Sequence, residues 1–315
     1  MITLLSTIFL FAEEKELRPY RLIHADSLQA VKSNGAYVSE LSGNVHFFYG
    51  DTEFFTDTAH IYEEQKLVMM VGNVEVYEDT VSLKADEVEY FRRQEKLKLM
   101  GDVYLYETHQ DSTWRTFEAE KVEYLLEIRD FQAWENVKVF DSREQVSGTC
   151  GYLTYSGDNG FGYLREEPEL MLVQNDSIRI KAQKIEYYDE YKKIVAIFEV
   201  ETIFTDYLLT SDFLIYFAED EKAIYRGQPQ LFSEQFDAKA SEVTIFFEEN
   251  SLDHATLQDS CLVFYKTIES GVKENSVSSD DMEFIFEDDV ISECRAYKNI
   301  KSDYIQQENR KKRQD

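Results

Sequence analysis

The sequence predicts an all-β, elongated fold built from repeated strand pairs, and three observations support this. Gly43-Asn44-Val45 is followed 29 residues later by Gly72-Asn73-Val74, and after 29 more by Gly101-Asp102-Val103. Apolar residues alternate over short runs rich in β-branched and aromatic types, and turn residues recur about every dozen positions. A fixed period of this length is typical of stacked supersecondary units, and period-two alternation indicates strands rather than helices.

The composition allows a large core and excludes one class of partner. Hydrophobic residues make up 43% of the 315 positions, with 21 Tyr and 22 Phe among them, so there is enough apolar area for a continuous interior. Acidic residues outnumber basic ones by 62 to 33, which gives a net charge of −29. A field of this sign repels phosphate backbones and anionic membrane faces, so we expect no nucleic-acid partner.

The two ends of the chain differ in character from its middle. Met1–Ala12 is an apolar run that stops at Glu13, and its length fits a signal peptide because a spanning helix needs about 20 apolar residues. No Lys or Arg precedes the run, so a buried first strand is the alternative. We expect a signal peptide at 1–12, one repeat domain at 13–305, and a disordered basic tail at 306–315.

The first half of each repeat is a strand whose inward face begins at the valine after Gly-Asn. In Val74-Glu75-Val76 the two valines share one face, because side chains alternate along a strand. Copies of this strand predict an inward apolar stripe of Val45, Phe47, Val74, Val76, Val103, Leu105, Val137, Val139, Leu170, Leu172, Ile203, Leu231 and Val263.

The second half begins with a small residue, followed by apolar residues three and five positions later, as in Ala85, Val88 and Tyr90. Nine copies start at positions 25, 56, 85, 119, 150, 182, 211, 240 and 279. Because Ala85 and Val88 differ in parity, we expect a bulge or corner at Asp86-Glu87, where a small side chain lets the backbone bend. This half adds Val88, Tyr90, Val122, Tyr124, Ile185 and Tyr187 to the inward stripe.

The three cysteines fit the repeat better than a reactive or metal-binding role. They are far apart and lack CxxC spacing. Cys150 falls on the small corner position, and Cys261 takes the place of Val45 and is expected to be a core residue.

No arrangement of residues predicts catalysis, a cofactor or a metal site. The five histidines are dispersed, and the chain lacks HExxH, GxSxG, P-loop and GxGxxG motifs. Ser156–Gly160 resembles a calcium loop in composition only, and we expect a hairpin turn there. Paired acidic residues fall at predicted turns and indicate a solvated surface. We therefore expect a protein that is not an enzyme.

The corner segments resemble a known repeat. Gly43-Asn44-Val45, Gly72–Tyr77, Ala85–Tyr90 and Lys98–Val103 look like the OstA-like repeat of the LptA family of lipopolysaccharide-transport periplasmic proteins, which also forms the N-terminal domain of the translocon LptD. The resemblance is strong over about 25–125 and continues as a pattern to about 300. No C-terminal barrel follows, so the chain is more similar to the bridge protein than to the translocon.

The resemblance implies a β-jellyroll of two facing, twisted sheets, open along one side. It also implies that the interior holds the acyl chains of lipopolysaccharide, and that members join end to end by pairing of edge strands, with a second copy or with other transport components. The pattern alone leaves two interpretations of the inward stripe: a groove for acyl chains, or the filled core of an exported structural or adhesive β-solenoid. With the resemblance, we predict a non-catalytic periplasmic carrier that moves lipopolysaccharide toward the outer membrane.

Overall fold

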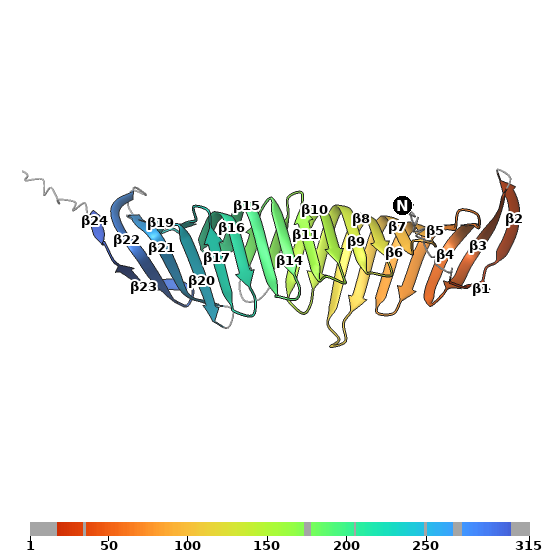
Figure 1. Ribbon diagram of the computed structural model, residues 1–315, viewed down its shortest axis with the longest axis horizontal. Coiled ribbons are helices and arrows are strands. Elements are labelled where there is room, and N and C mark those ends of the chain that lie inside the picture. Colours follow the sequence, from red (N-terminus) through yellow and green to blue (C-terminus); the bar gives the residue numbers. More distant parts are fainter. Residues whose placement is uncertain are drawn as a thin grey trace, which may run out of the picture.

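The molecule is an elongated, twisted stack of β-strands (Figure 1). The computed structural model describes residues 18–33, 36–172, 178–204, 206–248, 251–266 and 273–303. All regular structure in these residues is β, and the strands join in one 24-stranded sheet, which confirms the predicted all-β class. None of these residues belongs to a helix long and apolar enough to cross a membrane. The expected signal peptide at 1–12 and basic tail at 306–315 lie outside the described residues.

The strands follow one another along the chain and along the stack (Figure 1). They are β1 (Tyr20–His24), β2 (Ser27–Ser33), β3 (Ala36–Tyr49), β4 (Thr52–Tyr62), β5 (Leu67–Glu78), β6 (Val81–Phe91), β7 (Lys96–Thr108), β8 (Trp114–Leu125), β9 (Asp130–Asp141), β10 (Val146–Ser156), β11 (Phe161–Arg165), β12 (Glu169–Leu172), β13 (Ile178–Lys181), β14 (Lys184–Tyr188), β15 (Lys193–Phe204), β16 (Tyr207–Phe217), β17 (Lys222–Arg226), β18 (Gln230–Phe232), β19 (Phe236–Lys239), β20 (Glu242–Glu248), β21 (Ser251–Lys266), β22 (Lys273–Glu287), β23 (Val290–Tyr297) and β24 (Lys301–Asp303).

The long strands bend at corners, and the corner between β5 and β6 lies where the sequence predicts it. Between β5 and β6, Val71 pairs with Glu87 and Val74 with Ala85, so two residues of β5 lie opposite Asp86 alone. This two-against-one count is a β-bulge, which bends the strands. The inward face of β6 changes parity between Ala85 and Val88, as predicted, whereas that of β5 keeps its parity from Met70 to Val74. The corner expected at Asp86-Glu87 is therefore confirmed.

The corners divide the sheet into two facing layers. Register shifts recur at the same place in the pairings of β3 through β10. Residues 67–71 of β5 belong to layer 1 and residues 74–78 to layer 2. The halves of the other strands are assigned to a layer by their pairing with one or the other half of β5. We call the row of corners the spine, and the opposite side, where turns such as 63–66 and 79–80 lie, the seam. The strands continue through the spine but not across the seam, which confirms two facing sheets open along one side.

Prolines interrupt two of the long strands at their corners. β11 and β12 are separated at Pro168, and β17 and β18 at Pro229, although each pair follows the same path as an unbroken strand beside its neighbour. A proline has no N–H to donate to the ladder, so pairing stops there and resumes in the next layer.

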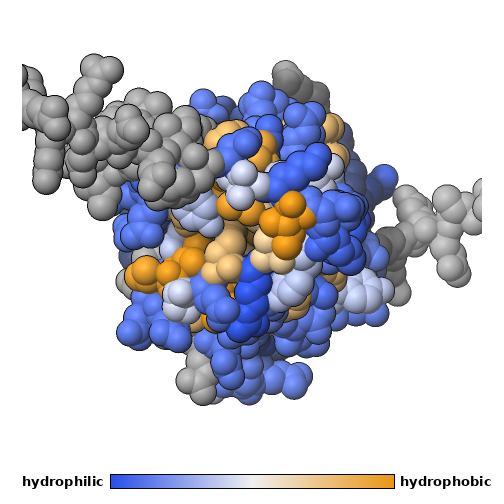
Figure 2. All heavy atoms as spheres, turned by 90° about the vertical axis from the view of Figure 1, so that its left-hand side faces the viewer, coloured by the Kyte–Doolittle hydropathy of each residue, from blue (hydrophilic) through white to orange (hydrophobic). Residues whose placement is uncertain are grey.

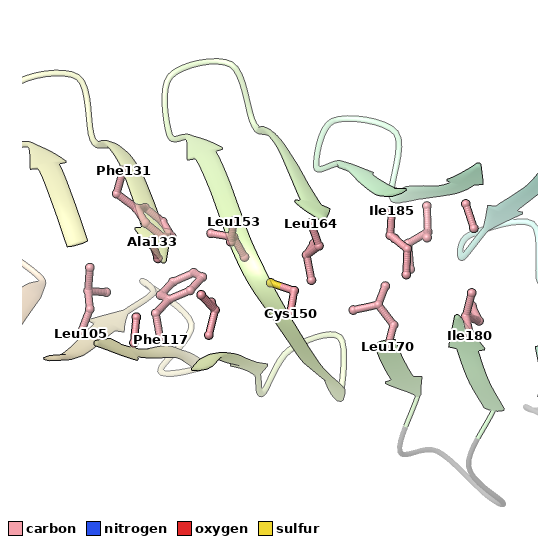
Figure 3. Packing of buried hydrophobic residues seen from close by; sticks show 14 of the residues in the cluster. Leu105, Phe117, Phe131, Ala133, Cys150, Leu153, Leu164, Leu170, Ile180 and Ile185 are labelled. Carbon is pink, nitrogen blue, oxygen red and sulfur yellow. The ribbon is translucent and has the colours of Figure 1, made fainter. Parts of the chain in front are cut away.

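The interior between the layers is apolar, and small residues line its spine. The valine that follows each corner faces a small residue on the next strand: Val74 pairs with Ala85, Val103 with Ala119, and Val137 with Cys150. Cys261 pairs with Ser279 and is buried, as expected for a core position. The outside is mostly polar, whereas the end of the molecule that carries β22 to β24 shows apolar side chains near its centre (Figure 2). Figure 3 shows apolar side chains of both layers pointing toward one another.

Candidate functional site

The predicted inward stripe lies between the two layers, with one exception. Its buried members are Val45, Phe47, Val74, Val76, Val88, Tyr90, Val103, Leu105, Val122, Tyr124, Val137, Leu170, Ile185, Leu231 and Val263. Val139, Leu172 and Tyr187 are partly buried and pack against this core. The structure therefore gathers residues from the whole length of the chain into one apolar interior.

Ile203 corrects the predicted stripe. Its side chain is 40% exposed, whereas its neighbours Thr202 and Phe204 are buried at 0% and 3%. The corner of β15 lies at Phe198-Glu199, which have φ of 60° and 51°, so Val200 holds the position that Val74 holds in β5. This corner contains no glycine. The sequence-based prediction placed the turn three residues too late and therefore assigned Ile203 to the interior.

Aromatic rings fill the interior at the N-terminal end. Phe47, Phe54 and Tyr90 are each 0% exposed, and Tyr49 is 1% exposed. The ring centres of Phe47 and Phe54 lie 4.9 Å apart in a stacked pair, and Phe54 and Tyr90 lie 5.3 Å apart. Packing of this kind leaves no room for a ligand unless the layers move apart.

The C-terminal end is filled in the same way. Tyr207 contacts Phe286 edge to face at 5.7 Å between ring centres, and Phe236 lies 5.3 Å from Phe284. All four side chains are buried. The interior is thus closed by aromatic packing on both sides of the middle repeats.

In the middle repeats an apolar cavity of about 100 Å³ opens between the layers. Its walls include Phe117, Leu153, Leu164 and Leu170, which Figure 3 shows on facing strands. Gly162 also lines the cavity, between Tyr155 and Tyr187, and a Cβ there would lie 2.9 Å from the backbone oxygen of Thr154, so glycine allows the strands to approach closely at this place. An engineered apolar cavity of about 150 Å³ stays dry and takes up small apolar molecules, so this cavity is of a size to hold part of an acyl chain.

The predicted inward stripe contains only part of this cavity wall. Val139, Leu170 and Tyr187 line the cavity, whereas Phe117, Leu153, Leu164 and Ile194 complete it and were not predicted as binding residues. Leu153 follows Cys150 by three positions, so the small-then-apolar rule contains a signal for it. The other three become neighbours only through pairing of distant strands.

Ion pairs link the two layers across the seam on either side of the cavity. Arg129 of layer 1 lies 3.1 Å from Asp79 of layer 2, and Lys192 of layer 1 lies 3.2 Å from Glu144 of layer 2. Lys192 also donates to Asp189 Oδ1 at 2.7 Å. Burial acts to raise the pKa of Asp189, but hydrogen bonds from Lys192 and Tyr187 outweigh it and hold that pKa below its ordinary value. The seam is therefore closed by charged side chains rather than by backbone pairing.

Arg115 and Asp141 stand at the mouth of the cavity. Arg115 is 8% exposed, its Nη2 lies 2.9 Å from Asp141 Oδ2, and its guanidinium carbon lies 5.2 Å from the centre of the Tyr155 ring. Asp141 Oδ1 accepts hydrogen bonds from the backbone amides of Arg143 and Glu144. Burial opposes the charge of Arg115, but Tyr155 and Asp141 outweigh it and raise its pKa, so the mouth carries a fixed, paired cation.

No group of three or more His, Cys, Asp or Glu side chains within the described ranges is placed to hold a metal ion. The outward His46 is half-buried, lies 2.8 Å from Glu53, and stacks on Phe55.

The sequence of the N-terminal strands and their corners is similar to that of a known family. Residues 20–127 match the family model described as OstA-like protein. This part of the chain is OstA-like. The match covers β1 to β8 and confirms the resemblance carried by the Gly-Asn-Val corners. No curated protein matches the sequence.

A solved structure similar to this chain is that of LptH from Pseudomonas aeruginosa, described as the LptA homologous periplasmic component of the conserved lipopolysaccharide transport device. The alignment has 12% identity and covers 49% of this chain and 94% of that one, with a TM-score of 0.30. Likeness at this score carries no argument about the function of this chain.

Proposed function

We propose that the protein is a non-catalytic periplasmic carrier that holds acyl chains of lipopolysaccharide between its two layers and passes them toward the outer membrane. The observation that carries this proposal is the apolar cavity that opens at the seam between two apolar sheet faces. The OstA-like match over residues 20–127 supports the choice of ligand, because that family resemblance implies lipopolysaccharide transport.

The layers are built so that a chain can enter from the seam. Backbone pairing runs through the spine, whereas the contacts across the seam include exposed ion pairs such as Arg129 with Asp79. Exposed pairs contribute only about 0–1 kcal/mol each, so these ion pairs add little to the free energy needed to part the seam locally. Burial of an acyl chain contributes about 25 cal/mol per Å² and needs no specific contact, so it favours binding and still permits sliding.

The ends of the stack are suited to joining with another sheet. β1 and β2 at one end, and β23 and β24 at the other, each pair with a single neighbouring strand within the described residues. Exposed apolar side chains lie at the C-terminal end, with Val290 at 52% and Ile300 at 57% (Figure 2). Free strand edges accept another strand, so a second copy or another transport component can extend the interior.

A site-specific photo-crosslinking experiment tests the proposal. Val139 lines the cavity, whereas its neighbour Lys138 points outward toward Glu118 on the same strand pair. A photo-crosslinking residue at Val139 or Leu170 should capture lipopolysaccharide in cells, and one at Lys138 should not. Capture at the outward position alone would refute a path between the layers.

A second function is favoured by the aromatic packing at both ends. Phe47, Phe54 and Tyr90 fill the interior as they would in an exported structural or adhesive β-solenoid with a closed core. Native mass spectrometry of protein purified from its own cell envelope distinguishes the two. Bound acylated lipid supports the carrier, and consistent absence of lipid, with no crosslink at Val139, supports the solenoid.

A further inference from the structure

We propose that a polar recess at the seam binds the anionic headgroup of the amphiphile whose acyl chain occupies the cavity; this rests on the proposed carrier function and locates its ligand. The recess has a volume of about 180 Å³ and lies between turns of layer 1 and turns of layer 2. Its ligand is an amphiphile with a phosphate or carboxylate head.

The recess and the cavity are adjacent. Arg115, Phe117 and Tyr155 line both spaces, so one wall is shared. The cavity is also lined by aliphatic side chains such as Leu153, Leu164 and Leu170. The recess is also lined by basic side chains such as Arg129 and Arg143. A molecule whose apolar tail lies in the cavity would therefore have its polar head beside the recess.

Basic side chains outnumber acidic ones among the residues that line the recess, unlike in the protein as a whole. The whole chain has 62 acidic and 33 basic residues, yet the recess is lined by three arginines and a histidine against two acidic side chains, Glu107 and Asp189. The basic residues are Arg115, Arg129, Arg143 and His109. Each arginine is also paired with a carboxylate outside this lining, namely Asp141, Asp79 and Asp111, so an anion would bind here by replacing such a partner.

Two of the arginines can exchange their partners for a ligand. Arg129 lies 3.1 Å from Asp79, and Arg143 lies 3.3 Å from Asp111. Both carboxylates are more than half exposed, so each pair contributes only about 0–1 kcal/mol. A guanidinium matches a phosphate or carboxylate with two parallel hydrogen bonds, which is a stronger interaction than these exposed pairs.

His109 offers a further hydrogen-bonding atom. Its Nε2 is buried and has no hydrogen-bond partner among the described residues, although its backbone is held in the turn by Thr113 and Ser112. A buried polar atom without a partner costs about 1–3 kcal/mol. A headgroup oxygen in the recess would provide the missing partner.

Calorimetry with simple amphiphiles tests the proposal on the full chain. The probes are n-decyl phosphate, n-decyl maltoside as a neutral head on the same tail, and inorganic phosphate as a head without a tail. We expect n-decyl phosphate to bind about tenfold or more tightly than the maltoside, as charge-assisted hydrogen bonds of about 1.5–3 kcal/mol predict. Inorganic phosphate should bind far more weakly than either.

The double substitution Arg129→Gln and Arg143→Gln should remove the preference for phosphate and leave maltoside binding unchanged. The matched control, Arg226→Gln with Arg295→Gln, removes two exposed, ion-paired arginines far from the recess and should change neither affinity. If the first pair unfolds the protein, His109→Ala serves as the second variant, with the same selective loss expected.

The outcomes separate this inference from the carrier function. Equal affinity for the two decyl probes, or an undiminished preference after the substitutions, would overturn the headgroup site and leave the carrier intact. Binding of inorganic phosphate as tight as that of n-decyl phosphate would overturn the link to the cavity. No binding of either decyl probe, together with no crosslink at Val139, would overturn the carrier itself.

Discussion

Replacing Gly72 with alanine tests the corner geometry on which both layers depend. Gly72 has φ of +86°, and a Cβ built on it would lie 2.4 Å from Asp57 Oδ2. The left-handed conformation costs a residue with a Cβ about 1–2 kcal/mol. Asp57 would also have to move away from Asn73, whose Nδ2 donates to Asp57 Oδ2 at 2.9 Å.

Loss of that exposed hydrogen bond adds about 0.5–1 kcal/mol, so we expect Gly72→Ala to lower the free energy of unfolding by about 1.5–3 kcal/mol in total. Urea denaturation followed by circular dichroism measures this change. Repeat arrays can unfold in parts, so hydrogen exchange at the amides of β5 and β6 should be measured in parallel.

A double-mutant cycle separates the two causes. Asp57→Ala removes the side chain that the new methyl group would meet, so Gly72→Ala in that background should cost only the conformational part, about 1–2 kcal/mol. A change below about 0.5 kcal/mol for Gly72→Ala alone would contradict the steric account, because surface substitutions without a special role fall in that range. An equal cost with and without Asp57 would show that the contact has no part in it.

Three further predictions concern the core, the thiols and the seam. Phe54→Ala should lower the free energy of unfolding by about 3–5 kcal/mol because the ring is fully buried, whereas Phe55→Ala on the outward face should lower it much less. Equal midpoints of urea denaturation for the two variants would contradict this packing. Burial raises the pKa of both Cys261, to about 11, and Cys294, but only the Cys294 side chain is exposed to reagent. In the native protein iodoacetamide should therefore label Cys294 and spare Cys261, as peptide mass spectrometry can show. Because the pKa of Asp189 is lowered on folding, its stabilising contribution is present above pH 3.8 and is lost as the pH falls through the folded value. The Asp189→Asn variant should therefore have a lower free energy of unfolding than the wild type near neutral pH, and this difference should become smaller below pH 3.8. A difference that does not change with pH would contradict the pairing of the carboxylate.

The sequence was most informative where local geometry repeats. The glycine-marked corners and the small residues opposite them constrain backbone shape over a few residues, so Val74, Ala85 and Val103 could be assigned to the interior from spacing alone. It was least informative where a corner lacks glycine. At Phe198-Glu199 the backbone takes the same left-handed turn with larger residues, and the register was placed three residues too far along.

Strand parity and corner spacing are local properties, and from them the sequence by itself determined the all-β class, the stacking and nearly all of the inward face. Only the tertiary structure decided where the interior is filled and where it opens. Phe54 and Tyr90 close one end because their rings meet from different strands, whereas a cavity opens between Phe117, Leu153 and Leu170, which come from three strands in two layers. The seam is likewise tertiary, since Arg129 and Asp79 are 50 positions apart and meet only after both layers have folded. Contacts of this kind depend on the distance between the layers, which no local pattern contains.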